Sequence, residues 1–234
     1  MKLIIEQNIF DKFPDVVLGV AVLRGVNNSG ESQEVGQLLR ETEEKAVSSL
    51  GSKPIVEQPF VLTWREAYRK FGAKPSDYPS SIENLLRREL KGERVRHINK
   101  LVDIYNVISL KYLVPVGGED LAKIKGDVLL TSAGENEPAI FLLGEKESRP
   151  PHVGEVIYKD NEGAICRRWN WKEADRTKLT EETIDAFLVI EGLPPVSRET
   201  ISSAVEDLAG MVRKYCGGEV STAIIDRNNP NIQL

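Results

Sequence analysis

The amino-acid sequence predicts an α+β protein, a single compact domain over residues 1–234 in which helices flank a mixed or antiparallel sheet. Amphipathic helical patterns dominate up to about residue 112, and short strand-like runs separated by turn residues dominate after it. Of the 234 residues, 41% are hydrophobic and 29% are charged, which is typical of a globular chain that forms its own core. Because helices precede most of the strands, an alternating βαβ arrangement is not expected.

The first half of the chain contains one predicted strand and four predicted helices. Residues 16–23 form a β-branched apolar run between Asp15 and Arg24, which is typical of a buried strand. After this run, apolar residues recur at helical spacing between charged ones. Helices are therefore expected over residues 33–49, 60–72, 81–90 and 99–112. Pro115 and Gly117-Gly118 end the last of these helices.

The second half contains five predicted strands and one predicted helix. Apolar runs between turn residues predict strands over residues 127–132, 139–143, 153–158, 164–171 and 186–191. A last helix is expected over residues 198–216, because Gly217-Gly218 is a typical helix stop.

Composition and motifs exclude several classes of protein. No apolar run approaches the roughly 18 residues of a membrane span, so no membrane partner is expected. Glu6 and Asp11 interrupt the N-terminus too early for a signal peptide, which favours a cytoplasmic protein. The two cysteines and two histidines lack metal-ligand spacing, and neither a metal nor a cofactor is expected. Dinucleotide-binding, P-loop and serine-hydrolase motifs are absent from the sequence.

Positive charge is concentrated in one segment of an acidic chain. The formal net charge is −5, but residues 87–100 carry six basic and two acidic side chains. Such a cluster suits contact with RNA phosphates. Its basic members are Arg87, Arg88, Lys91, Arg94, Arg96 and Lys100. Composition alone favours the alternative, a solvated linker between two helices.

The string from Arg167 to Lys172 is the most unusual in the chain. If it is a strand, Arg168, Asn170 and Lys172 lie on one face, with Trp169 and Trp171 on the other. The Arg-Asn face suits a pocket for the charged backbone groups of an amino acid. An exposed edge strand with charged residues explains the string equally well.

A second polar set lies on the helix predicted over 99–112. Asn99, Asp103 and Asn106 share one face of that helix, beside its apolar stripe. The favoured interpretation is an N-cap at Asn99 with internal hydrogen bonds, and the alternative is the floor of a pocket.

Several strings, taken in their order, resemble a known family. Residues 98–106, with Pro115 and Asp120-Leu121, are similar to the INxxVDxxN…P…DL signature of the phenylalanyl-tRNA synthetase beta subunit. The similarity is to its tRNA-binding and editing module, the third and fourth domains, and more closely to free-standing proteins made of that module alone. Matching strings also occur at Trp64–Tyr68, Gly154–Tyr158 and Arg167–Trp171. The resemblance covers residues 64–218, with 1–63 expected as a strand and helix layer packed on it.

The resemblance implies a pocket that hydrolyses an amino acid wrongly esterified to tRNA. In the synthetase the amino acid is tyrosine, and the chemistry needs a held ester and a positioned water. Glu173 falls near the editing glutamate of the family, which implies that it orders the water. Gly117 stands where the synthetase has a pocket histidine, and Arg167, Arg168, Trp169 and Trp171 replace a glycine-rich wall. These departures imply a ligand other than tyrosine.

The leading hypothesis is therefore an editing-type hydrolase that deacylates mischarged aminoacyl-tRNA and releases a free amino acid. Arg168 and Asn170 line the pocket, and Glu173 is the catalytic residue. Asn99, Asp103 and Asn106 support the floor, Gly117 is a further substrate-binding position, and the basic segment meets the tRNA backbone. The alternatives are a non-catalytic module that binds a free amino acid or an RNA end, and a small-ester or amide hydrolase independent of RNA. The sequence does not define the oligomeric state.

Overall fold

Two β-sheets organise the chain, and the computed structural model describes all residues from Met1 to Leu234. In spatial order, the larger sheet contains β10 (Asn231–Gln233), β1 (Lys2–Ile5), β4 (Val128–Ser132), β5 (Val156–Asp160), β6 (Gly163–Arg167) and β7 (Lys172–Glu173). The smaller sheet contains β3 (Val116–Asp120), β8 (Ala186–Gly192), β2 (Val17–Arg24) and β9 (Glu219–Ile225). All strand pairs are antiparallel except β1 with β4. The predicted α+β class with a mixed sheet is confirmed.

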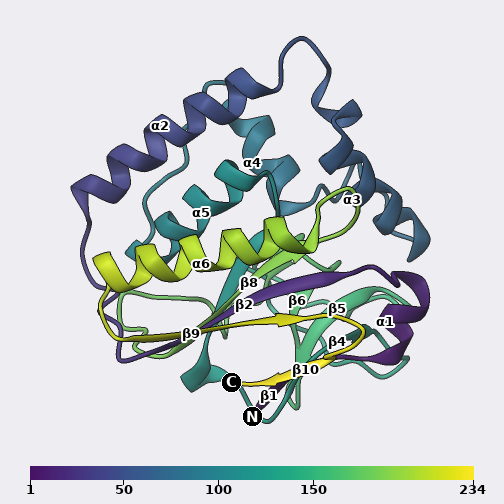
Figure 1. The fold of residues 1–234 in the computed structure, drawn as a ribbon. Coiled ribbons are helices and arrows are strands. Elements are labelled where there is room, and N and C mark those ends of the chain that lie inside the picture. Colours follow the sequence, from purple (N-terminus) through teal and green to yellow (C-terminus); the bar gives the residue numbers. More distant parts are fainter.

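Six helices accompany the sheets. They are α1 (Gln7–Lys12), α2 (Gln33–Ser49), α3 (Pro59–Lys70), α4 (Ser81–Glu89), α5 (Lys100–Tyr112) and α6 (Arg198–Tyr215). Helices α5 and α6 cover one face of the smaller sheet, and α2 packs outside α5, farther from the strands (Figure 1). No helix combines the length and the apolar composition needed to cross a membrane.

Helix α6 packs closely on the smaller sheet at two strand positions that lack side chains. A Cβ at Gly19 would lie 2.9 Å from the Ile201 side chain, and one at Gly192 would lie 2.8 Å from it. The helix therefore presses its apolar stripe directly on β2 and β8. This contact buries Leu188 and Ile190, the residues of β8 that point toward the helices.

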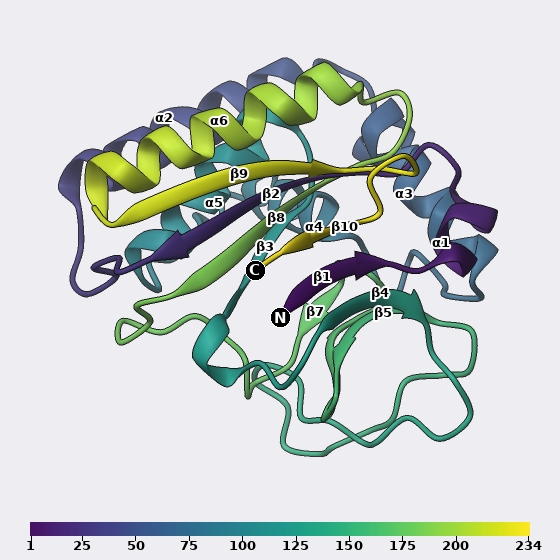
Figure 2. The same cartoon turned by 60° about the horizontal axis from the view of Figure 1, so that its bottom comes forward.

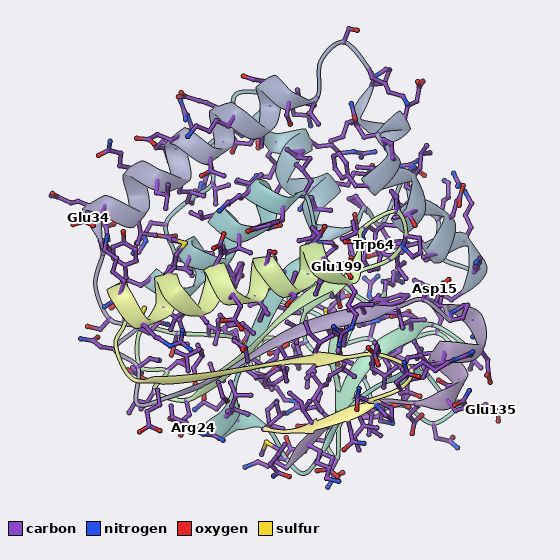
Figure 3. The ribbon with its side chains drawn as sticks, in the orientation of Figure 1. Asp15, Arg24, Glu34, Trp64, Glu135 and Glu199 are labelled. Atoms are coloured by element: carbon purple, nitrogen blue, oxygen red, sulfur yellow. The ribbon has the colours of Figure 1, made fainter.

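The other face of the smaller sheet looks toward the larger sheet. Strands β1 and β10 of the larger sheet, beside which the two chain ends lie, are its part nearest to the smaller sheet (Figure 2). One apolar cluster joins Leu18 and Phe187 of the smaller sheet to Leu130 of the larger sheet. Trp64 of α3, on the side of that helix facing the strands, and Trp169 belong to the same cluster (Figure 3).

Several sequence-based element predictions are wrong. The predicted strand 139–143 has only isolated pairs, Ile140 with Arg149 and Leu142 with Ala174. The Gly117-Gly118 pair, predicted as a helix stop, lies inside β3, which has few apolar residues to mark it as a strand. The elements at the chain ends, β1, α1, β9 and β10, were not predicted, because each is short or partly exposed.

Candidate functional site

A pocket of about 440 Å³ opens between the smaller sheet, helices α4 and α5, and the connection from β6 to β7. Its floor is one face of β3 and β8. Gly117 pairs with Val189 and Glu119 pairs with Phe187 across these strands, so all four positions share a face. Glu191 lies two residues beyond Val189 and points to the same side. This floor therefore places a glutamate toward each end and a glycine between them.

One wall of the pocket is a tight turn where the sequence predicted a strand. Strand β6 ends at Arg167, and Arg168 and Trp169 adopt left-handed φ angles of 47° and 66°. The prediction of a continuous strand over 164–171 is therefore wrong, and so is the placement of Arg168, Asn170 and Lys172 on a common face. Asn170, Trp171 and Lys172 all line the pocket, together with Trp169, whereas Arg168 does not.

Packing against α3 holds this turn in place. Trp169 is fully buried and contacts Trp64 edge-to-face at 5.1 Å. Tyr68, one helical turn beyond Trp64, donates a hydrogen bond of 2.8 Å from its hydroxyl to Asn170 Oδ1. A left-handed residue other than glycine costs roughly 1–2 kcal/mol, and burial of a large aromatic side chain offsets such a cost. The strings Trp64–Tyr68 and Arg167–Trp171 thus form one structural unit.

A buried ion pair holds the other side of the turn. Glu155 accepts hydrogen bonds of 2.9 and 2.7 Å from the Arg167 guanidinium and one of 3.0 Å from the Arg168 backbone N–H. The guanidinium of Arg168 stacks over the Tyr78 ring at 3.6 Å. Arg168 is therefore occupied in supporting the wall, outside the pocket that the sequence assigned to it.

Glu173 is the predicted catalytic residue, and the structure places it in the pocket. Its side chain is half-buried where it meets the pocket, and this burial raises its pKa to about 7, although the Gly118 backbone N–H acts in the opposite direction. It carries no ion pair. A Cβ at Gly117 would lie 3.1 Å from Glu173 Oε1, so the glycine leaves room for the carboxylate.

Two further glutamates, which sequence reasoning missed, line the same pocket. Burial raises the pKa of Glu191 to about 7, and its oxygens receive hydrogen bonds from Tyr158 at 2.6 Å and from Asn170. Burial and the neighbouring Glu173 raise the pKa of Glu119 well above its usual range. The sequence signal for Glu191 was its position as the one acidic residue in the apolar run 186–191, on the same strand face as Phe187 and Val189. Nothing in the sequence marks β3, which carries Glu119.

The polar set of helix α5 divides between the pocket and the supporting structure. Asn106 lines the pocket, is 7% exposed, and its amide makes no hydrogen bond within the chain. Asn99 caps the helix by accepting from the Val102 N–H at 3.1 Å. Asp103 contacts His97 Nδ1 at 2.6 Å. Neither Asn99 nor Asp103 lines the pocket. Of the three polar residues predicted to share one helix face, only Asn106 therefore reaches the pocket.

The basic segment is partly neutralised by acidic side chains. Arg87 pairs with Glu83 at 2.6 Å, and Arg94 contacts Glu43 at 3.2 Å. Lys100 is 8% exposed, with its ammonium near the Tyr215 carbonyl. Arg88 lines the pocket and lies 3.6 Å from Glu93. Lys91 and Arg96 are exposed without an ion pair, so these two are the basic side chains most available to a phosphate.

The chain is similar in sequence to a subunit of an aminoacyl-tRNA synthetase. The chain is 24% identical over 165 residues to the phenylalanine–tRNA ligase beta subunit of Fusobacterium nucleatum. The alignment covers 61% of this chain and 20% of that subunit, so the chain spans about a fifth of its relative. A crystal structure of an N-terminal fragment of the phenylalanyl-tRNA synthetase beta subunit from Pyrococcus horikoshii matches with a TM-score of 0.48 and 15% identity. That match covers 93% of this chain and 49% of the fragment.

The family is defined by a match to most of the chain. Residues 63–217 match the B3/4 domain, and the chain belongs to this domain family. The resemblance expected from the sequence strings is thereby confirmed.

Proposed function

We propose that this protein is an editing-type hydrolase that deacylates mischarged aminoacyl-tRNA, with Glu173 as its general base. The observation that carries the proposal is a carboxylate with a pKa of about 7 that faces a pocket without an ion-pair partner. A base with a pKa near the operating pH is suited to taking a proton from water. The relationship to a tRNA ligase subunit supports aminoacylated tRNA as the substrate.

The reaction follows from the position of Glu173. Its carboxylate takes a proton from a water molecule as the water oxygen attacks the ester carbonyl carbon. The tetrahedral intermediate collapses, the bond from this carbon to the ribose oxygen breaks, and that oxygen receives the proton from Glu173. The products are the amino acid, whose new carboxyl group then ionises, and the tRNA with its hydroxyl restored.

The distribution of charge suits an aminoacyl ester better than a free amino acid. Three glutamates line the interior, whereas the basic side chains Arg88 and Lys172 line it only from α4 and from the start of β7. An ester presents a cationic α-amino group and no carboxylate, so it matches an acidic interior. Hydrolysis creates a carboxylate in that interior, and the resulting repulsion favours release of the free amino acid.

Contact with the tRNA backbone is assigned to the exposed basic side chains. Lys91 and Arg96 lie near Arg88 in the sequence and are free to meet phosphates. Because much of the segment is paired with acidic residues, the proposed tRNA affinity is modest and sensitive to salt. Action on charged tRNA locates the protein in the cytoplasm, where translation takes place.

A deacylation screen tests the proposal. The purified protein is incubated at low salt with cognate and mischarged aminoacyl-tRNAs, and the released amino acid is counted. Selective release from one or a few mischarged species is expected. Glu173→Gln is expected to reduce this release by about 10²–10⁴-fold. The matched control is Glu182→Gln, which removes an exposed carboxylate on a loop.

Two results would count against the proposal. Equal turnover by the wild type and Glu173→Gln would remove Glu173 from the mechanism. No release from any species, with circular dichroism showing a folded protein, would favour the non-catalytic binding module instead. That alternative requires saturable binding of a free amino acid or an RNA end.

A further inference from the structure

The two ends of the pocket floor differ in how their glutamates are satisfied. Glu119 pairs with Phe187, and Glu191 lies four residues farther along β8, so the two positions are about 13 Å apart at the usual strand rise. At one end, Tyr158 and Asn170 each donate to a different oxygen of Glu191. At the other end, Glu119 is 5% exposed and its Oε2 has no hydrogen-bond partner. The polar group nearest to the Glu119 carboxyl is the Thr177 hydroxyl, and Glu119 Oε2 and Thr177 Oγ1 both lack a hydrogen-bond partner.

A second polar side chain of this pocket has no partner within the chain. Asn106, on helix α5, is more than nine-tenths buried and lines the pocket, yet its amide makes no hydrogen bond within the chain. The polar atoms of Asn106 are not fully enclosed by protein, so this amide is open to the cavity and available to hydrogen-bond a ligand there. Glu119 and Asn106 therefore form an incomplete polar set inside a cavity.

The charges lining the cavity determine which ligand would complete this set. Three glutamates line it, and its two basic side chains already have acidic partners, Glu93 for Arg88 and Glu145 for Lys172. An apolar ligand side chain would leave Glu119 unsatisfied, and a hydroxyl would give a hydrogen bond without compensating the charge. A cation provides both.

We propose that Glu119 recognises the cationic end of an aminoacyl side chain, so that the preferred substrates are tRNA esters of basic amino acids. This assignment rests on the proposed deacylase function, in which Glu173 is the base and Glu119 selects the side chain. Glu191 is already hydrogen-bonded and supports the wall through Asn170.

Protonation of the empty pocket gives the proposal a second readout. Burial, the charge of Glu173 and, to a smaller extent, Asp160 raise the pKa of Glu119, and they outweigh the opposite effects of the Thr177 hydroxyl and Arg176. The empty pocket therefore holds extra protons near neutral pH. A bound cation favours the ionised carboxylates. Binding of a basic aminoacyl group is therefore expected to release protons, whereas binding of a neutral one is not.

The test compares lysine with norleucine, which has the same carbon chain but lacks the ε-amino group. Both amino acids are attached to one tRNA, and the initial rates of deacylation are measured. We expect the wild type to hydrolyse the lysyl ester at least tenfold faster. Glu119→Gln, which keeps the shape of a neutral carboxyl, is expected to lose most of that preference. Glu57→Gln, at an exposed position, is the matched control and should keep the wild-type ratio.

Non-hydrolysable amides of 3′-amino-3′-deoxyadenosine with the same two amino acids separate the two proposals. Their binding is measured by calorimetry in buffers of different ionisation enthalpy. Tighter lysyl binding with proton release, lost in Glu119→Gln, supports the assignment even if no ester is hydrolysed, in which case only the deacylase function fails. Equal rates or affinities for the two ligands overturn the assignment while leaving the deacylase function intact. A preference that persists in Glu119→Gln also overturns it.

Discussion

Glu155 and Glu173 lie near the same end of the larger sheet, and burial raises the pKa of each, yet their net pKa shifts are opposite. Glu155 meets the guanidinium of Arg167 and the backbone of Arg168, and these partners hold its pKa below the usual value despite its burial. Glu173 has no cation beside it, and burial raises its pKa to about 7. The comparison shows that the partner of a buried carboxylate decides whether its pKa falls below or rises above the usual value.

The largest expected effect on stability comes from removing the paired carboxylate of Glu155. Glu155→Ala leaves Arg167 buried without a counter-ion and the Arg168 N–H without an acceptor, so we expect a loss of about 3–5 kcal/mol in the free energy of unfolding. Urea denaturation measures it. The control is Glu147→Ala, which breaks only an exposed pair with Arg149 and should leave the midpoint unchanged. A loss no greater than that of the control would contradict the structural role of Glu155.

Removing the unpaired carboxylate of Glu173 should raise the free energy of unfolding rather than lower it, and the size of this gain should depend on pH. Between about pH 4.5 and 7 the folded protein holds a proton on Glu173 that the unfolded chain has released, so this group lowers stability as pH rises through that interval. Glu173→Gln removes the buried charge. The stability of this variant minus that of the wild type should therefore be larger at pH 8 than at pH 5, by on the order of 2 kcal/mol.

Denaturation at both pH values, with Glu182→Gln as the control, measures this difference. A stability difference that does not change between pH 5 and pH 8 would mean that Glu173 is not protonated in the folded protein near neutral pH.

A smaller effect is expected at Gly117, where the backbone φ is not left-handed and alanine is conformationally acceptable. The added Cβ would lie 3.1 Å from Glu173 Oε1, so the carboxylate must shift by a few tenths of an ångström. We expect Gly117→Ala to retain its stability within about 1 kcal/mol and to lose roughly tenfold in deacylation. Gly36→Ala, with open space around its Cβ, should leave turnover unchanged. Unchanged turnover in Gly117→Ala would show that the position of Glu173 is not critical.

The smallest effects concern the proposed contact with tRNA. The slope of log binding constant against log salt concentration measures the number of phosphate contacts. Lys91→Gln and Arg96→Gln should each reduce the size of this slope by about one. Arg94→Gln should change it less, because Arg94 is already paired with Glu43 and Glu44. Filter binding at several salt concentrations tests this order, and an equal or larger effect at Arg94 would reverse the assignment.

Local pattern was sufficient to predict five of the six helices but not the arrangement of the site. The helix predicted over 33–49 is found with the same limits, because its 3.6-residue periodicity follows directly from one buried face. The turn at Arg168 and Trp169 was missed, since no local signal favours left-handed arginine and tryptophan. Their conformation depends on Trp64 and Glu155, which are distant in the sequence.

The candidate site shows the same limit. Four predicted pocket residues, Asn106, Gly117, Asn170 and Glu173, do line one cavity. Asn99 and Asp103 share their helix but point elsewhere, because helical spacing alone does not say which part of a face is covered. Glu119 escaped prediction because it lies on a glycine-containing strand that is recognisable only from its pairing with β8.

The strained turn that forms the pocket wall also affects the thermodynamics of binding. Trp169 is locked between aromatic rings, and Glu155 holds the backbone of Arg168, so the wall has its final shape before any ligand arrives. The conformational entropy of this segment is lost during folding rather than during binding. A ligand therefore meets a preorganised surface, and its binding should show little of the unfavourable entropy that accompanies the ordering of a loop.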